Sequence, residues 1–381
     1  MRFHVWLQLD SPLVISRNRA TGNQLRTLSH VPGTAWRGAA AAALMREKRL
    51  GEDAHKDAEF HALFLEGKVR FGDLRAGGEA PFPLSTRCCS LHDHHRYRDL
   101  LLYSALGEAV PQTCGAWTGG DTCCEARLIP GEGFIRWEKG QPTGLKPDTR
   151  VTAHTAISND ALRIRTGQFY SSTVLEAGQT LRGELWAEDG GAEVVAKQFQ
   201  DPLRLVLGRG GSRGQGRATV TMQAIPQADE RRQVRERLEA LNALFAPGGR
   251  VAFTVTLRSP CLVYDRWLCA RPFLTAEDIG EAAGEPTGSL AGYALINWFS
   301  RFITVSGWNA QARLPKPDVR AIAPGSAFVF CREVTAESKG AELDRLEDVL
   351  SRARRGIGER WEEGFGEASF CDEIHYALRS S

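Results

Sequence analysis

Residues 208–216 read Gly-Arg-Gly-Gly-Ser-Arg-Gly-Gln-Gly, and residues 356–366 read Gly-Ile-Gly-Glu-Arg-Trp-Glu-Glu-Gly-Phe-Gly. Both segments carry a Gly-x-Gly at each end. Upstream, residues 9–14 read Leu-Asp-Ser-Pro-Leu-Val and residues 257–263 read Leu-Arg-Ser-Pro-Cys-Leu-Val. These openings begin 248 positions apart, at 9 and at 257. The pattern indicates that the chain contains two copies of one structural unit.

Each copy is expected to begin with a strand, a loop and a helix. Apolar residues alternate with polar ones over residues 3–9 and 253–258, the period of two that a half-buried strand requires. The alanine-rich residues 35–49 favour a helix in the first copy. We expect its counterpart at residues 292–302, where four apolar residues fall at helical spacing: Leu295, Trp298, Phe299 and Phe302.

Further along, residues 164–170 and 179–186 resemble two strands of a hairpin around Glu176-Ala177-Gly178. The spacing of apolar residues predicts an amphipathic helix over residues 229–245 and another helix over residues 343–350. These patterns predict an α+β fold of two tandem ferredoxin-like domains of the β-α-β-β-α-β type, each ending in a glycine-rich loop. We expect a first domain at 1–227 with a Cys/His-containing insertion at about 75–150, a linker helix at 228–249, and a second domain at 250–381.

The composition of the 381 residues is that of a soluble globular protein, with 42% hydrophobic and 25% charged residues. The N-terminus lacks a secretory signal, and no apolar run approaches the ~20 residues of a membrane span. We therefore expect a cytoplasmic protein without a membrane partner. The formal charge is only +2, so nucleic-acid binding must come from local clusters of arginine. Three such clusters lie at residues 204–217, 231–237 and 352–355.

The glycine loops suit an anionic ligand, and RNA is the leading hypothesis. Glycine amides approach a phosphate closely, and Arg209, Arg213 and Arg217 supply positive charge in the first loop. The second loop, with three glutamates, is less basic and could face protein instead. No Gly-Lys-Ser or Gly-Lys-Thr occurs, which disfavours a nucleotide-binding loop.

Five of nine cysteines crowd between positions 88 and 124, with three histidines among them. Thiolate and imidazole are zinc ligands, and cytosolic thiols are kept reduced. We predict a structural zinc site, although ordinary thiols remain the alternative because spaced Cys-x2-Cys pairs are absent. The predicted ligands are Cys88, Cys89, His95, Cys114, Cys123 and Cys124.

His30 precedes Pro32-Gly33-Thr34 and could serve as the general base of a metal-independent ribonuclease, because its pKa lies near neutrality. A hydrogen-bonding or packing role is the alternative. Trp267 and Trp308 stand in loop-like segments, where they could stack on unpaired bases or pack into the core.

The motifs together resemble the RAMP superfamily of CRISPR effector proteins. The chain is most similar to the tandem-RAMP subunit of type III-D complexes, the Csx-ten group. The resemblance covers essentially the whole chain and rests on residues 31–38, which read Val-Pro-Gly-Thr-Ala-Trp-Arg-Gly, on the two glycine loops, and on Ser-Gly-Trp-Asn at 306–309. The cysteine-rich segment is similar to that group's zinc-bearing insertion.

The resemblance implies a non-catalytic subunit that holds the repeat-derived 5′ tag of a CRISPR RNA and joins the large subunit to the backbone RAMP subunits, with target RNA contacted indirectly. The RNA-contacting residues that it implies are Gly33, Thr34, Arg37, Arg163, Arg165, Arg209, Gly210, Arg213, Gly214, Arg217 and Trp308. The alternative is a RAMP endoribonuclease that processes CRISPR precursor RNA, with His30 as its catalytic residue.

Overall fold

The computed structural model describes residues 1–16, 24–77, 80–92, 97–115, 124–131, 133–138, 141–157, 164–188, 190–245, 249–309, 312 and 314–379. These residues form a mixed α/β fold with several antiparallel sheets. Within them, no helix combines the length and the apolar character needed to cross a membrane.

The largest sheet is built from the first half of the chain and has seven strands. Its order is β15-β16-β1-β14-β5-β3, and β4 also pairs with β14. The bounds are β1 (Arg2–Leu9), β3 (His30–Val31), β4 (Val69–Phe71), β5 (Leu74–Ala76), β14 (Thr180–Ala187), β15 (Leu203–Val206) and β16 (Arg217–Ile225). The predicted alternation in β1 is confirmed, because Phe3, Val5, Leu7 and Leu9 are all buried.

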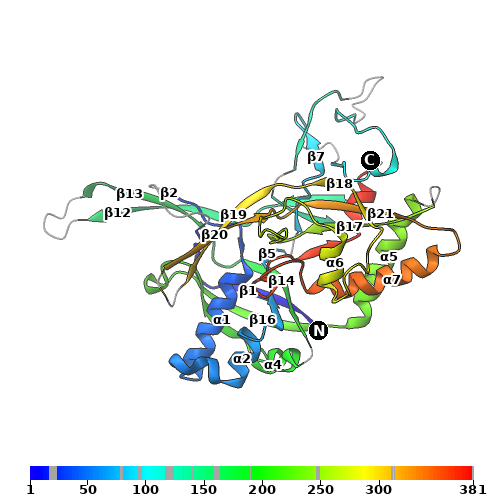
Figure 1. The fold of residues 1–381 in the computed structure, drawn as a ribbon. Coiled ribbons are helices and arrows are strands. Elements are labelled where there is room, and N and C mark those ends of the chain that lie inside the picture. The colour runs from blue at the N-terminus through cyan, green and yellow to red at the C-terminus, as the bar shows by residue number, and fades with distance from the viewer. Residues whose placement is uncertain are drawn as a thin grey trace.

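Three helices and a 3-10 helix accompany this sheet at the bottom of Figure 1. They are α1 (Gly33–Glu47), the 3-10 helix η1 (Glu52–Lys56), α2 (Ala58–Phe64) and α4 (Gly191–Gln198). The predicted alanine-rich helix is therefore present as α1. Its small side chains let it lie close to the sheet, and Trp36 is buried edge-on against Phe71 at 4.6 Å between ring centroids.

The second half has a four-stranded antiparallel sheet in the order β18-β21-β17-β22. Its elements are β17 (Arg250–Leu257), α6 (Ala276–Ala282), β18 (Ala294–Phe299), β21 (Ala327–Glu333), α7 (Lys339–Arg352), β22 (Ala368–Phe370) and α8 (Glu373–Ala377). The amphipathic helix predicted before it is α5 (Gln227–Leu244). Its apolar side chains belong to the core of this half, together with α7.

The prediction of a helix at residues 292–302 is wrong, because most of that segment forms strand β18. Leu295 and Phe299 fit both a helical and a two-residue period, and pairing with β21 decides between them. The helix after β17 is instead α6, which begins with a capping box between Thr275 and Asp278.

Each half also extends a long hairpin, and both project toward the left of Figure 1. One is β12 (Thr149–Ile157) with β13 (Ile164–Leu175), flanked by β2 (Gln24–Leu25); the other is β19 (Phe302–Asn309) with β20 (Leu314–Ile322). The strands expected around residues 164–170 and 179–186 exist, but their pairing was predicted wrongly. The first, β13, pairs with β12 on one side and with β2 on the other. The second, β14, pairs with β1 in the seven-stranded sheet.

The segment predicted as an insertion packs on the second half of the chain. Leu101, Leu102 and Ala105, in and beside α3 (Tyr103–Leu106), share one core cluster with residues of β17 and β21. Phe82 and Ile135 pack with Ile374 and Leu378 at the C-terminal helix. The remaining strands here are β6 (Ala80–Pro81), β7 (Thr86–Cys89), β8 (Arg98–Asp99), β9 (Leu128–Pro130), β10 (Phe134–Glu138) and β11 (Gln141–Leu145).

Candidate functional site

The two glycine loops, residues 208–216 (loop 1) and 356–366 (loop 2), are held by the same backbone hydrogen bonds. The Gly216 amide donates to the Pro12 carbonyl at 2.9 Å, and that of Gly366 to Pro260 at 2.7 Å. The Arg217 amide donates to the Ser11 hydroxyl at 2.8 Å, and that of Glu367 to Ser259 at 2.9 Å. Each loop contains a one-turn 3-10 helix between residues of left-handed conformation. Each position in loop 1 is therefore equivalent to the position 150 residues later in loop 2.

The charge of the two loops is inverted at equivalent positions. Three arginines of residues 209–217 stand where residues 359–367 carry glutamates: Arg209 and Glu359, Arg213 and Glu363, Arg217 and Glu367. Because the backbone frame is the same, the side chains give the two loops opposite charge at these three positions.

Loop 2 lies against the first half of the chain. A Cβ added at Gly364 would stand 2.5 Å from the Phe71 carbonyl oxygen and 3.2 Å from Gly33 Cα. The Trp361 ring meets Trp186 edge-on at 5.7 Å between centroids. Only glycine fits between these backbones, so loop 2 is a docking element between the halves.

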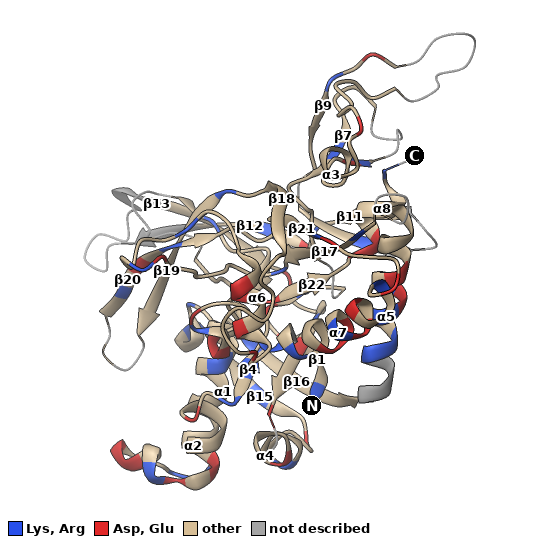
Figure 2. Ribbon diagram, turned by 45° about the vertical axis from the view of Figure 1, so that its right-hand side comes forward, with Lys and Arg blue, Asp and Glu red and all other residues tan. Residues whose placement is uncertain are grey.

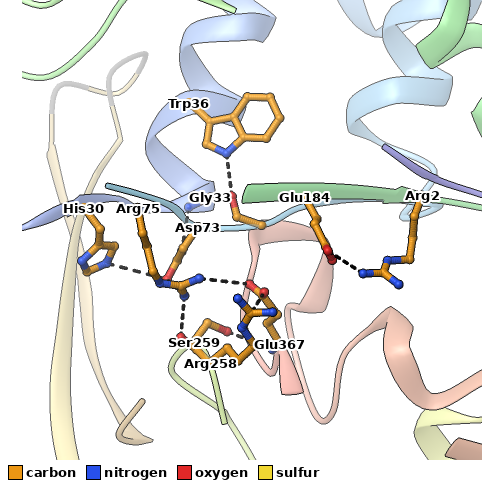
Figure 3. Close-up of polar contacts among 11 residues, drawn as sticks. Arg2, His30, Gly33, Trp36, Asp73, Arg75, Glu184, Arg258, Ser259 and Glu367 are labelled. Atoms are coloured by element: carbon orange, nitrogen blue, oxygen red, sulfur yellow. Dashed lines mark hydrogen bonds and ion pairs between the residues drawn. The ribbon is translucent and has the colours of Figure 1, made fainter. Parts of the chain in front are cut away.

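A buried charge network continues this contact (Figure 3). Glu367 lies 3.8 Å from the guanidinium of Arg75 and 3.7 Å from that of Arg258, and Arg75 also donates to the Arg258 carbonyl at 2.5 Å. Burial alone would raise the pKa of Glu367, but Arg75, Arg258 and Arg70 outweigh it and hold that pKa below its ordinary value. Glu367 is therefore ionised, and its negative charge is balanced by buried arginines of the protein itself.

Loop 1 faces outward. Arg209, Arg213 and Arg217 are exposed, and within the described part of the chain none of them makes an ion pair. Arg213 lies 3.4 Å from the Tyr170 hydroxyl on strand β13, so loop 1 and the β12–β13 hairpin are neighbours. The surface offers three guanidinium groups beside glycine amides.

The other two arginine clusters are largely neutralised. Figure 2 shows basic and acidic segments interleaved along α5 and α7. Arg231 pairs with Asp348 at 3.1 Å, Arg235 with Glu239 at 2.5 Å, and Arg352 with Asp348 at 2.8 Å. Of the clusters predicted from sequence, the one around loop 1 thus keeps the most charge available for a ligand.

Other residues predicted to contact RNA have different surroundings. Gly33 is buried beneath loop 2, Thr34 is half-buried, and Arg37 donates to the Phe64 carbonyl. Trp308 is 61% exposed on strand β19. Arg163 lies outside the described residues, and Arg165 is described only by its backbone in β13. RNA contacts of these residues stay predictions.

His30, the residue of the alternative enzymatic hypothesis, is largely buried beside Asp73. Its Nε2 lies 3.6 Å from one carboxylate oxygen of Asp73, and the other oxygen accepts a hydrogen bond from the Gly33 amide at 3.0 Å. Burial lowers the pKa of His30, and the charge of Asp73 only partly offsets this effect. His30 Nδ1 is buried without a hydrogen-bond partner among the described residues, and the ring lies edge-on to Phe134 at 6.2 Å between centroids, so the geometry suits a packing role.

A second cluster lies in the inserted segment. The Cys89 and Cys124 sulfurs are 3.8 Å apart, and His92 Nδ1 lies 3.7 Å from the first and 3.8 Å from the second. A zinc ion bonded to sulfur at about 2.3 Å and to nitrogen at about 2.0–2.1 Å in a tetrahedron would place neighbouring ligand atoms about 3.6–3.8 Å apart. The three side chains therefore fit three corners of such a site.

The predicted ligands are only partly brought together. Cys89 and Cys124 join the cluster, and Cys114 is buried against both. Cys88, next in the same strand, lies 3.7 Å from the Ile129 carbonyl oxygen. His95 and Cys123 lie outside the described residues. His92 was missed as a ligand, although its Cys-x2-His spacing from Cys89 was the available signal.

No protein-family model matches the chain, and no curated protein matches its sequence. Among solved structures, a chain of the Type III-B Cmr-beta bound to cognate target RNA and AMPPnP matches with 12% identity and a TM-score of 0.43, covering 91% of this chain and 94% of its own. Crystal structures of Cmr4 and of Pyrococcus furiosus Cmr4 (Cas7) match with 12% and 14% identity and TM-scores of 0.28 and 0.27. Each covers 59% of this chain and 100% of its own. At TM-scores below 0.5 these matches carry no functional argument, which must come from the residues of this chain.

Proposed function

We propose that this chain is a non-catalytic RNA-binding subunit of a type III CRISPR RNA-guided complex. It holds the repeat-derived 5′ tag of the CRISPR RNA and bridges the large subunit and the backbone RAMP subunits. The family assignment rests on the resemblance of the Pro-Gly-Thr segment and the two glycine loops. The location of the RNA-binding surface rests on loop 1.

The proposal includes two tandem ferredoxin-like units. The second half supports it with the order β17-α6-β18-β21-α7-β22 along the chain and β18-β21-β17-β22 across the sheet. In the first half, β16, β1, β14 and β5 lie in the same relative order, with α1 after the first strand. The matching hydrogen bonds of the glycine loops point to the same duplication.

The observation that carries RNA binding is the inverted charge of two otherwise equivalent loops. Loop 2 uses Glu363 and Glu367 to contact cations of the protein, including Lys316 at 3.1 Å. Loop 1 has arginines at these positions and keeps them at the surface. Guanidinium groups that make no ion pair with a described residue are suited to phosphate groups, for which they supply positive charge, whereas the Gly214 and Gly216 amides donate inside the protein and are not part of this contact.

A structural zinc ion is part of the proposal. Cys89, His92 and Cys124 would hold it, with Cys114 beside them as the nearest described thiol for the fourth position. When bound, the ion would cross-link β7 to the segment before β9.

The experiment is equilibrium binding of single-stranded CRISPR repeat RNA to the purified chain at several salt concentrations. We expect Arg213→Ala/Arg217→Ala to weaken binding and to lower the slope of log K against log salt by about 1.4, because each single-strand phosphate contact contributes roughly 0.7. The matched control is Arg231→Ala/Arg232→Ala, which removes the same charge from α5, where both arginines are ion-paired. An unchanged slope in the loop variant, or an equal loss in the control, would reject loop 1 as the phosphate-binding surface.

The same RNA incubated with protein in EDTA separates this function from an endoribonuclease. We expect binding without site-specific cleavage, because the His30 imidazole is buried against Asp73. Cleavage that disappears in His30→Ala would establish the enzyme instead.

A further inference from the structure

A short turn in the second half exposes apolar side chains that no packing explains. Residues 264–270 follow Leu262, whose carbonyl accepts the Glu359 amide of loop 2 at 2.9 Å. At the tip, Trp267 is 72% exposed and Leu268 is 82% exposed. Trp267 is the most exposed tryptophan among the described side chains.

The turn is built to hold this tip in one conformation. A carboxylate oxygen of Asp265 accepts the Trp267 amide at 2.8 Å and the Cys269 amide at 2.9 Å. The Asp265 amide donates to the Cys269 carbonyl at 2.9 Å, and Tyr264 pairs with Ala270. Leu268 adopts a left-handed φ of 60°, which residues other than glycine rarely do. The exposed indole is therefore preorganised.

The neighbouring charge indicates a ligand with both an aromatic surface and a negative group. The Arg266 guanidinium lies 5.0 Å from the centre of the Trp267 ring, within cation–π distance. Arg266 makes no ion pair with any described residue, and one oxygen of the nearby Asp265 carboxylate accepts two backbone amides. The guanidinium lies over the ring, where it is available to the phosphate of a ligand bound on the indole.

We propose that Trp267 and Arg266 form a stacking site for an unpaired base of single-stranded RNA, with the base on the indole and its phosphate on the guanidinium. The site rests on the RNA binding proposed above and uses residues other than those of loop 1, and Tyr264 of the same turn packs with Ile303 and Val319 of the β19–β20 hairpin. Stacking tolerates any base, because every base presents a flat aromatic face. Asp265 acts as a positioning residue.

The test compares two strands of equal length, one of ordinary single-stranded RNA and one with abasic ribose at every position. Trp267→Ala should weaken binding of the ordinary strand by about fivefold or more, the lower end for one stacked base. Trp267→Phe should retain most of the affinity. The affinity for the abasic strand should not change with Trp267→Ala, whereas Arg213→Ala/Arg217→Ala should weaken binding of both strands, since loop 1 contacts phosphate.

Leu268→Ala is the matched control, because it truncates the adjacent exposed side chain without removing an aromatic ring. We expect no change in affinity from it. If Leu268→Ala weakens RNA binding as much as Trp267→Ala does, or if Trp267→Ala is silent while the loop 1 variant loses affinity, the stacking site is wrong and the tip is left as a protein-docking surface. If the wild-type chain binds neither strand, the proposed function fails and the stacking site with it.

Discussion

At the scale of single residues, the buried His375 joins three distant parts of the chain. Its Nδ1 lies 2.9 Å from Asp99 of the inserted segment, and its Nε2 lies 2.6 Å from the Thr256 hydroxyl on β17. The second carboxylate oxygen of Asp99 accepts from Ser85 at 2.6 Å and Thr86 at 2.9 Å. All the partners are buried, so a Thr-His-Asp arrangement here serves to hold segments together.

This ion pair predicts a pH-dependent stability. Burial would lower the pKa of His375, but Asp99 outweighs it and raises that pKa above the ordinary 6.5. Burial would raise the pKa of Asp99, but the charge of His375 and the hydrogen bonds lower it below 3.8. The histidine contribution is complete below pH 6.5 and is lost as pH rises through the raised value. The carboxylate contribution is present above pH 3.8 and is lost as pH falls through the lowered value.

We therefore expect the difference in melting temperature between wild type and His375→Gln to be largest between about pH 4 and 6.5 and to shrink at higher pH. Asp372 also faces the imidazole and raises its pKa, so Asp372→Asn is the control and should shift the profile only slightly. A wild-type-to-variant difference that stays constant from pH 5 to 9 would show that folding does not shift the pKa of His375, and a difference that grows as pH rises would show that His375 is neutral in the folded state.

At the scale of elements, equivalent glycines of the two loops form a matched pair. Gly214 and Gly364 both have left-handed φ angles, 80° and 94°. Nothing lies within 4 Å of a Cβ built at Gly214, whereas one at Gly364 would meet the Phe71 carbonyl oxygen at 2.5 Å. Alanine at either position costs about 1–2 kcal/mol in backbone strain. We expect Gly364→Ala to lower the free energy of unfolding measurably more than Gly214→Ala, in urea titrations of both variants. Equal losses would mean that loop 2 does not dock on the first half.

Sequence alone predicted elements well where one period was unambiguous. Strand β1 and helix α5 each show a single clear period, whereas helix α1 was predicted from its alanine content and the paired glycine loops from their spacing. Residues 292–302 failed because Leu295 and Phe299 satisfy two periods at once. The packing of loop 2 against the first half could not be predicted, since it depends on contacts such as that of Glu367 with Arg75, nearly 300 positions away. The Cys-x2-His spacing from Cys89 could have indicated His92 as a ligand, but its contact with Cys124, 32 positions away, is set by tertiary packing.

At the scale of the whole molecule, the two halves hold each other reciprocally. The second half sends loop 2 onto α1 and β4 of the first, and the first half sends its inserted segment onto the core of the second. Figure 1 shows this arrangement in colour, with cyan strands of the inserted segment beside orange and red elements from the end of the chain. Such exchange makes the relative position of the two halves depend on both contacts.

Metal removal tests how far the inserted segment depends on its cysteine cluster. We expect the purified chain to contain about one zinc per molecule and Cys89→Ser to lose it, because a thiolate is a far stronger zinc ligand than a hydroxyl. The control is Cys331→Ser, which changes a buried thiol in β21 away from the cluster. In hydrogen exchange, chelation should then expose amides of β7 and β9 while β1 and β16 keep their protection, since Asp99 and α3 still anchor the segment to the second half. Zinc content that is equal in both variants would exclude Cys89 as a ligand, and loss of protection in β1 would show that the ion supports the whole molecule.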